Sequence, residues 1–119
     1  MTEAHELGRT SETIAARYLV ERGYDILERN YRVGHKEVDL IVSRHDLVAF
    51  VEVKARAGVG FGHPLEAITW AKRREVSYVA RAWIAAHGRA GLNYRFDAVA
   101  IQWQGGRPSV EHIPNAWTL

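Results

Sequence analysis

The sequence predicts an α/β fold in which a mixed β-sheet is flanked by helices. Two stretches show apolar residues at helical spacing, residues 6–22 and residues 64–87. Five shorter stretches are rich in β-branched and aromatic residues and are bounded by turn-forming residues, which is typical of strands. The order along the chain is therefore α-β-β-β-α-β-β, and helices packed on a sheet bury such elements naturally.

The first helix is predicted over residues 6–22. Gly23 follows it directly, where a glycine commonly ends a helix. Glu12 lies on the same predicted face as the apolar residues, which indicates that its side chain points inward. The alternative interpretation is an acidic residue that interacts favourably with the helix N-terminus. The residues that define the inward face are Leu7, Ile14, Ala15, Ala16, Tyr18 and Leu19.

Three strands are predicted next. The run "YDILERNYRV" at residues 24–33 alternates in the manner of a strand. It is followed by the β-branched run "EVDLIV" at residues 37–42 and by "LVAFVEVKAR" at residues 47–56. Between the last two, "SRHD" predicts a four-residue turn.

The second half begins with "AGVGFGH" at residues 57–63, a glycine-rich loop. A helix is predicted from Pro64 or Thr69 to about His87, then a strand "YRFDAVAI" at residues 94–101 and a short final strand at residues 109–113. We interpret Asp97 as a structural residue that pairs with an arginine. Residues 1–119 are expected to form a single domain, a size that buries a core without disulfides.

The composition excludes several classes of site. The chain has no cysteine, which rules out disulfides, zinc–thiolate sites and cysteine nucleophiles. No apolar run approaches the ~20 residues of a membrane span, and the polar N-terminal residues do not resemble a signal peptide. We therefore expect a cytoplasmic protein with no membrane partner. The formal charge of +2 permits nucleic-acid binding without requiring it.

Charged residues gather at one end of the predicted hairpin. A four-residue turn sets Asp39 opposite Phe50 and makes it a diagonal neighbour of Glu52, with Cα atoms about 7–8 Å apart. The same face carries Lys54 and Glu37. The opposite face is purely apolar and is predicted to be the packed one; it consists of Val38, Leu40, Val42, Leu47, Ala49, Val51 and Val53.

Two neighbouring carboxylates and a lysine predict a particular chemistry. Clustered carboxylates repel one another, so one takes up a proton or the group binds a cation. Oxygen ligands suit a hard divalent ion, Mg²⁺ or Mn²⁺, which activates water and stabilises charge on a phosphodiester. Lys54 then orients the water or supports the phosphorus. The alternative interpretation makes Glu52 and Lys54 an exposed ion pair, with Asp39 solvated beside it.

The run "EVDLIV" followed by "VAFVEVKAR" resembles the PD-(D/E)XK motif of the restriction-endonuclease-like superfamily. Over nearly its full length, the chain resembles the YraN-type family of small bacterial proteins. Val38 stands where the superfamily motif has proline, and Ser11 and Lys36 stand where the YraN-type family usually has glycine. The matching segments are "GRTSETIAARYLVERGYDILERN", "EVDLI", "FVEVKAR", the Lys72 position and "RFD" at residues 95–97.

This resemblance implies a restriction-endonuclease-like fold, similar to that of archaeal Holliday-junction resolvases. It implies that Asp39, Glu52 and Lys54 are catalytic. It also implies that Asp39, Glu52, the carbonyl of Val53 and Glu12 hold the metal ion. Glu37 is expected to be an auxiliary ligand or to support the ligands.

Four basic residues are expected to line a groove and hold phosphates without reading sequence: Lys36, Arg56, Lys72 and Arg73. The alternatives are a solvated helix face and, for Lys72, a lysine whose stem covers apolar surface. Two functions remain open. One is a divalent-metal-dependent nuclease acting on nucleic acid, expected to be branched or junction DNA, for which a homodimer would cut both strands. The other is a non-catalytic nucleic-acid-binding or interaction module that works with DNA repair or recombination proteins.

Overall fold

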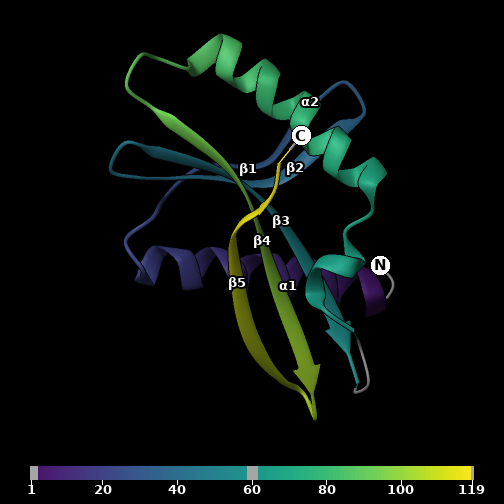
Figure 1. Ribbon diagram of the computed structural model, residues 1–119. Helices are drawn as coiled ribbons and strands as arrows, with labels where there is room; N and C mark the ends of the chain where they lie inside the picture. The colour runs from purple at the N-terminus through teal and green to yellow at the C-terminus, as the bar shows by residue number, and fades with distance from the viewer. Residues whose placement is uncertain (1–2, 59–61, 119) are drawn as a thin grey trace.

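The computed structural model describes residues 3–58 and 62–118, in which two α-helices pack against one five-stranded sheet (Figure 1). The spatial order of the strands follows the sequence; β3 and β4 run parallel, and the other neighbours run antiparallel. The predicted mixed sheet and element order are thus confirmed. No helix in the described ranges is long and apolar enough to cross a bilayer. The elements are α1 (Glu3–Glu21), β1 (Asp25–Val33), β2 (Lys36–Arg44), β3 (Leu47–Ala57), the 3₁₀ helix η1 (Pro64–Ala67), α2 (Trp70–His87), β4 (Asn93–Gln104) and β5 (Arg107–Trp117).

The helix ends follow local sequence signals. Gly23 has a positive φ of 90°, and the next N–H, that of Tyr24, donates to Leu19 O at 3.1 Å. At the start of α2, the Thr69 hydroxyl accepts a hydrogen bond from Lys72 N at 3.1 Å. The predicted end of α1 is therefore confirmed, and α2 begins after Thr69, the second of its two predicted starting points.

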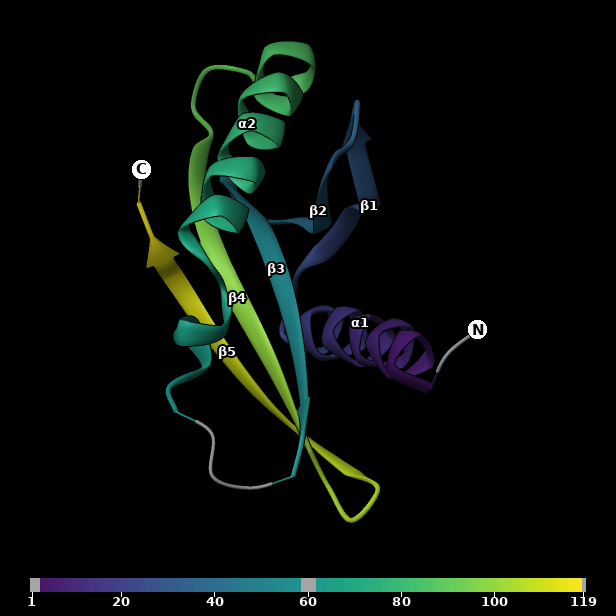
Figure 2. The same cartoon turned by 90° about the vertical axis from the view of Figure 1, so that its right-hand side faces the viewer.

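Each helix covers its own face of the sheet (Figure 2). The prediction that one face of the β2–β3 hairpin forms the packed core is therefore incomplete, because α2 also buries the apolar part of the other face. The α1 cluster contains Ala15, Ala16, Leu19, Tyr24, Leu40, Val42, Ala49, Val51, Val99 and Ile101. The α2 cluster contains Val38, Ile41, Val48, Phe50, Ile68, Val76, Val79, Ala80, Trp83, Ala98 and Trp117.

The turn between β2 and β3 has two residues rather than the predicted four. Arg44 pairs with Leu47, and Ile41 pairs with Phe50. His45 takes a positive φ of 56°, which two-residue hairpin turns require, and this lets both strands extend further. The predicted register is therefore wrong by two residues. A shift of two by itself keeps alternate side chains on the same face. The alternation of β2 nevertheless breaks beside Asp39, because Val38 packs in the α2 cluster whereas Leu40 packs in the α1 cluster. The predicted charged face is therefore not continuous, since Glu52 follows Phe50 on the α2 side while Glu37 contacts Asn30, which also binds Glu12 of α1.

The side of the sheet that faces α2 changes from apolar to polar along β3. Val48 and Phe50 are buried beneath α2, and Glu52 is also buried, with 3% of its surface exposed. Lys54 and Arg56 follow and are partly exposed. Figure 2 shows the far ends of β3, β4 and β5 continuing beyond α2. Glu52 therefore stands at the boundary between the packed core and the open part of this face.

A second buried charge, Asp97 on β4, is structural as predicted. Arg95 donates to both of its carboxylate oxygens at 2.7 Å, and His112 Nε2 lies 2.8 Å from Oδ2. Asn115 N also donates to Oδ1, at 3.0 Å. Burial alone would raise the pKa of Asp97, but these hydrogen bonds outweigh it and lower the pKa.

We expect Asp97→Asn to destabilise the fold by about 3 kcal/mol, because Arg95 would lose a buried carboxylate partner. Urea unfolding at pH 7 measures this loss. The matched control is Asp25→Asn at the exposed start of β1, where the change should stay within about 0.5 kcal/mol. Equal effects of the two substitutions would contradict the structural role of Asp97.

Candidate functional site

The site begins where β2 separates from β3. The ladder between these strands ends at the pair Leu40 and Val51. Beyond it, the N–H of Val53 donates to the carboxylate of Asp39, with Oδ2 at 2.7 Å. The N–H and C=O of one residue in an extended strand point to the same side, so the Val53 carbonyl faces the same opening. We call this opening the β2–β3 fork, defined by Asp39 and Val53.

Glu52 precedes Val53 and is the most buried acidic residue at the fork. Its Oε2 lies 3.9 Å from Lys72 Nζ, and its Oε1 is buried with no hydrogen-bond partner in the described part of the chain. Burial, and then the charge of Asp39, raise the pKa of Glu52 to about 9, although Lys72 and Lys54 act in the opposite direction. Without an added cation, Glu52 therefore holds a proton at neutral pH.

Glu12 reaches the site from α1 through Asn30 on β1. With its amide nitrogen turned toward the carboxylates, Asn30 donates to Glu12 Oε1 at 2.8 Å and to Glu37 Oε1 at 3.1 Å. Burial, followed by the charges of Asp39 and Glu37, raises the pKa of Glu12 to about 7. Glu12 therefore points inward, as predicted, and is connected to Glu37 through the amide of Asn30.

Asn30 itself was not predicted to belong to the site. It has a positive φ of 49°, a conformation that asparagine tolerates better than most residues. An asparagine inside a strand-like run is unusual because asparagine is depleted in strands. An asparagine within a predicted strand was therefore the sequence signal that could have identified this residue.

Lys72 joins the site from the first turns of α2. Its Nζ donates to the Glu37 carbonyl and to Glu75 Oε2, both at 3.2 Å. Glu75 Oε2 also accepts from Glu37 N at 2.9 Å, which fixes α2 against the start of β2. Burial would lower the pKa of Lys72, but Glu52 and Glu75 outweigh it and raise the pKa. Glu75 was missed from sequence; its spacing of three residues from Lys72 was the only hint.

Lys54 lies on the open side of the site. It is partly exposed and makes no hydrogen bond or ion pair within residues 3–58 and 62–118. Its charge nevertheless acts on Glu52, whose pKa it lowers. The predicted set Asp39, Glu52 and Lys54 is therefore brought together, with Glu12 joined to it through Asn30.

The remaining basic residues have local contacts. The guanidinium of Arg56 donates to the carbonyls of Gly62 and His63 at 3.0 and 3.1 Å. Arg73 donates to two carbonyls in the segment before α2, with Nε 3.0 Å from Ile68 O. Lys36 is exposed, and its Nζ lies 5.4 Å from the ring centre of Tyr78. Arg56 and Arg73 thus brace the chain that leads into α2.

The donor atoms at the fork suit a hard divalent cation that keeps part of its water shell, rather than an ion that is fully enclosed by protein ligands. Among the described residues, no three His, Asp or Glu side chains converge into a group that could hold a metal ion. Mg²⁺ is commonly bound through one or two carboxylates while it keeps several waters. Asp39 and the unpartnered oxygen of Glu52 fit such an ion, and the Val53 carbonyl adds a third oxygen.

Comparisons with known proteins place these residues in a wider group. The profile described as "Uncharacterised protein family UPF0102" matches residues 11–101, which include Glu12 and Lys72. The chain is 44% identical over 117 residues to a UPF0102 protein of Clavibacter michiganensis subsp. michiganensis (strain NCPPB 382), covering 98% of this chain and 99% of the relative. It is 45% identical over 112 residues to a UPF0102 protein of Rhodococcus jostii (strain RHA1), covering 93% and 95%.

The raised pKa values predict a distinctive pH dependence in the absence of metal. Glu52 and Glu12 bind protons more tightly in the folded chain than at their ordinary pKa of 4.5. The folded state therefore holds more protons than the unfolded state, and stability falls as the pH rises from about 5 to about 9. Glu52→Gln should flatten this decline and stabilise the protein at alkaline pH.

Urea unfolding in EDTA across this pH range measures the effect. Glu21→Gln at the exposed end of α1 is the matched control and should keep the wild-type slope. A Glu52→Gln variant with the full wild-type slope would show that Glu52 does not carry the retained proton.

Proposed function

The chain belongs to the uncharacterised protein family UPF0102, and we propose that it is a divalent-metal-dependent nuclease. The proposed reaction is hydrolysis of phosphodiester bonds in nucleic acid, with branched or junction DNA as the expected substrate. The mixed sheet and the positions of Asp39, Glu52 and Lys54 support a restriction-endonuclease-like assignment. Similarity of fold alone would not support an activity.

The single observation that carries the proposal is the buried oxygen Glu52 Oε1, which has no partner in the described chain. A buried carboxylate with an unpaired oxygen is unfavourable unless something compensates its charge. Lys72 is the nearest ammonium to Glu52, at 3.9 Å, yet it is bound more closely by Glu75 at 3.2 Å. In the metal-free chain a proton supplies this compensation, because burial and the charge of Asp39 raise the pKa of Glu52 to about 9. A cation bound by Glu52 and Asp39 would take the place of that proton.

Asp39, Glu52 and the Val53 carbonyl would hold the ion, with Glu12 as a further ligand. When bound, Mg²⁺ or Mn²⁺ supplies Lewis-acid stabilisation of phosphate charge and lowers the pKa of a coordinated water. The apolar residues behind Glu52 keep water out of the space beneath the carboxylate. The protein therefore contributes a dry, acidic position beside an open face.

The two lysines have different roles in this proposal. Lys54 lies at the open side, so its ammonium binds the phosphate or orients the attacking water. Lys72 is held by the Glu37 carbonyl and Glu75, so it positions Glu52 from behind. We accordingly call Lys54 the candidate catalytic lysine and Lys72 a positioning residue.

A second candidate function is a non-catalytic nucleic-acid-binding or interaction module that works with repair or recombination proteins. The observation that favours it is the hydrogen bond between Asp39 and Val53 N, together with the lack of three converged acidic side chains in the described chain. In that case the fork is a structural junction, and cation binding is not needed.

Metal binding separates the two candidates. We expect Mg²⁺ or Mn²⁺ at millimolar concentration to raise the Tm by several degrees, because a ligand that binds the folded state stabilises it by mass action. Asp39→Asn should raise the Tm of the metal-free protein by removing a repulsive charge, and it should abolish the response to metal. Differential scanning fluorimetry with and without EDTA measures both effects.

The control variant is Asp25→Asn, which lies at the other end of the sheet from the fork and should respond to metal like the wild type. Absence of any metal response in the wild-type protein would leave the interaction module as the better candidate.

Cleavage tests the nuclease directly. Plasmid, flap, four-way junction and single-stranded substrates are incubated with Mn²⁺, and products are resolved on denaturing gels. Lys54→Met should lower the rate about 10²- to 10³-fold, as expected when one charge-stabilising group is lost. Arg81→Met, a change at an exposed arginine of α2, should retain most activity. Equal cutting by the Lys54→Met variant would indicate a contaminating nuclease.

A further inference from the structure

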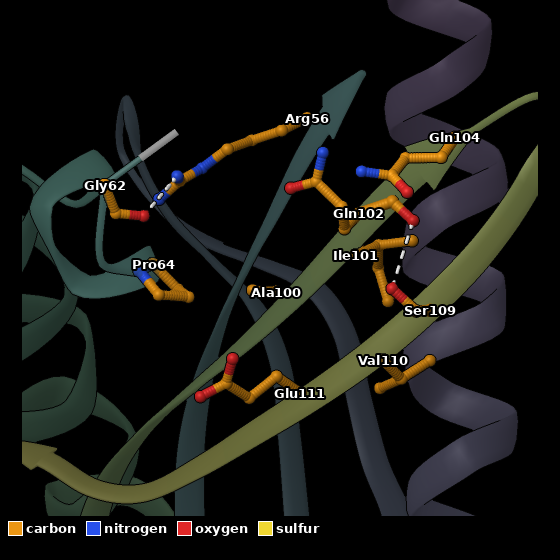
Figure 3. A pocket seen from close by; sticks show the side chains of 10 residues that line it. All are labelled: Arg56, Gly62, Pro64, Ala100, Ile101, Gln102, Gln104, Ser109, Val110 and Glu111. Atoms are coloured by element: carbon orange, nitrogen blue, oxygen red, sulfur yellow. Dashed lines mark hydrogen bonds between the residues drawn. The ribbon is translucent and has the colours of Figure 1, made fainter. Parts of the chain in front are cut away.

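A pocket of about 580 Å³ lies on the open part of the sheet, beyond the N-terminal end of α2 (Figure 3). Figure 3 shows side chains of β4 and β5 on one side of the pocket and Arg56, Gly62 and Pro64 on the other side. We call it the β4–β5 pocket. It is lined by Arg56, Gly62, Pro64, Ala100, Ile101, Gln102, Gln104, Ser109, Val110 and Glu111.

The pocket continues directly from the candidate site. Lys54 pairs in register with Ala100, and Ala100 pairs with Glu111 on the next strand. Directly paired residues share a face of the sheet, and neighbouring strands lie about 4.8 Å apart. The floor of the pocket therefore begins one strand away from Lys54, on the side of the sheet that also carries Glu52.

The chemistry of the lining differs from that of a phosphate site. Arg56 and Glu111 are its charged residues, so its formal charge is zero. The rest of the polar lining consists of two glutamine amides and a serine hydroxyl, which offer both donors and acceptors. Mixed donors and acceptors of this kind match the edges of nucleobases, whereas phosphate requires excess positive charge.

Three hydrogen bonds hold the pocket in shape. Gln102 Nε2 donates to the carbonyl of Gly58, and the Ser109 hydroxyl donates to Gln102 O at 3.4 Å. On the opposite wall, Arg56 Nη1 donates to Gly62 O at 3.0 Å (Figure 3). The polar groups are therefore positioned before any ligand arrives, which lowers the entropy lost on binding.

We propose that the β4–β5 pocket binds unpaired nucleotides of a DNA strand whose phosphate lies at Lys54. The proposal rests on the nuclease function proposed above and narrows its substrate class to DNA with a single-stranded segment. A volume of about 580 Å³ falls within the range of small-ligand pockets, ~300–1,000 Å³. It accommodates an unstacked nucleotide or two and is too small for a duplex, so bases that are already unpaired enter most readily.

The test compares binding of a fluorescein-labelled single-stranded oligonucleotide with that of a blunt duplex of the same sequence. Fluorescence anisotropy is measured in EDTA, so that no cleavage occurs, and at one fixed salt concentration. Ala100→Leu fills the floor of the pocket and should weaken single-strand binding about tenfold, the loss of roughly one base contact. Ala85→Leu at an exposed position of α2 is the matched control and should bind like the wild type.

A second variant tests the pocket independently in case Ala100→Leu fails to fold. Gln104→Ala removes an exposed amide from the pocket rim and should weaken single-strand binding about threefold, with an unchanged Tm. The proposal is overturned if both variants bind the single strand as tightly as the wild type. It is also overturned if wild-type protein prefers the blunt duplex, or if Ala100→Leu weakens duplex binding equally.

Failure of the pocket proposal can be distinguished from failure of the nuclease proposal. Metal-dependent changes in Tm and cleavage are measured on the same variants, and Ala100→Leu should keep the wild-type response of Tm to Mg²⁺. Wild-type binding that the pocket variants weaken, without any cleavage, would support the pocket and reject the nuclease. Cleavage that depends on Lys54 but is unaffected by Ala100→Leu would reject the pocket and support the nuclease.

Discussion

The hydrogen bond from Val53 N–H to the Asp39 carboxylate is the constraint on which the site depends. It takes the place of further pairing between β2 and β3, whose ladder ends at Leu40 and Val51. A side chain thereby satisfies a backbone donor that would otherwise be left unpaired near the core. Because β2 leaves β3 at this point, the two strands separate within the sheet, and the charge of Asp39 at the fork acts on both Glu52 and Glu12.

The acidic cluster at this opening is short of positive charge. Glu37 has Arg32 at 2.9 Å and Glu75 has Lys72 at 3.2 Å, so two of the cations nearest the site are already paired. Glu52 has no comparably close cation, and burial together with the charge of Asp39 raises its pKa. The same carboxyl group is thus a proton-binding group in the metal-free chain and, in our proposal, a ligand when a cation is present.

The sequence patterns predicted the helices and strands but not the contacts that bring the acidic side chains together. The alternation of β2 and β3 predicted Asp39 and Glu52 on one face. The structure shifts the register by two residues and breaks the alternation of β2 at Val38, yet it leaves Asp39 close enough for its charge to raise the pKa of Glu52. The two-residue turn depended on His45 accepting a positive φ, which no propensity favours strongly. The contacts of Asn30 depend on long-range packing, which local patterns do not encode.

The gradient along β3 explains why the candidate site and the pocket belong to one surface. α2 covers the side of the sheet at Phe50, and its cover ends at Glu52. Beyond that boundary, the side chains on the same face become basic on β3 and neutral polar on β4, as Lys54 and Gln102 illustrate. A ligand that crosses this surface meets carboxylates, then an ammonium, then amides. A nucleotide has a matching order when its phosphate lies at the acidic end beside a cation and its base lies over the amides.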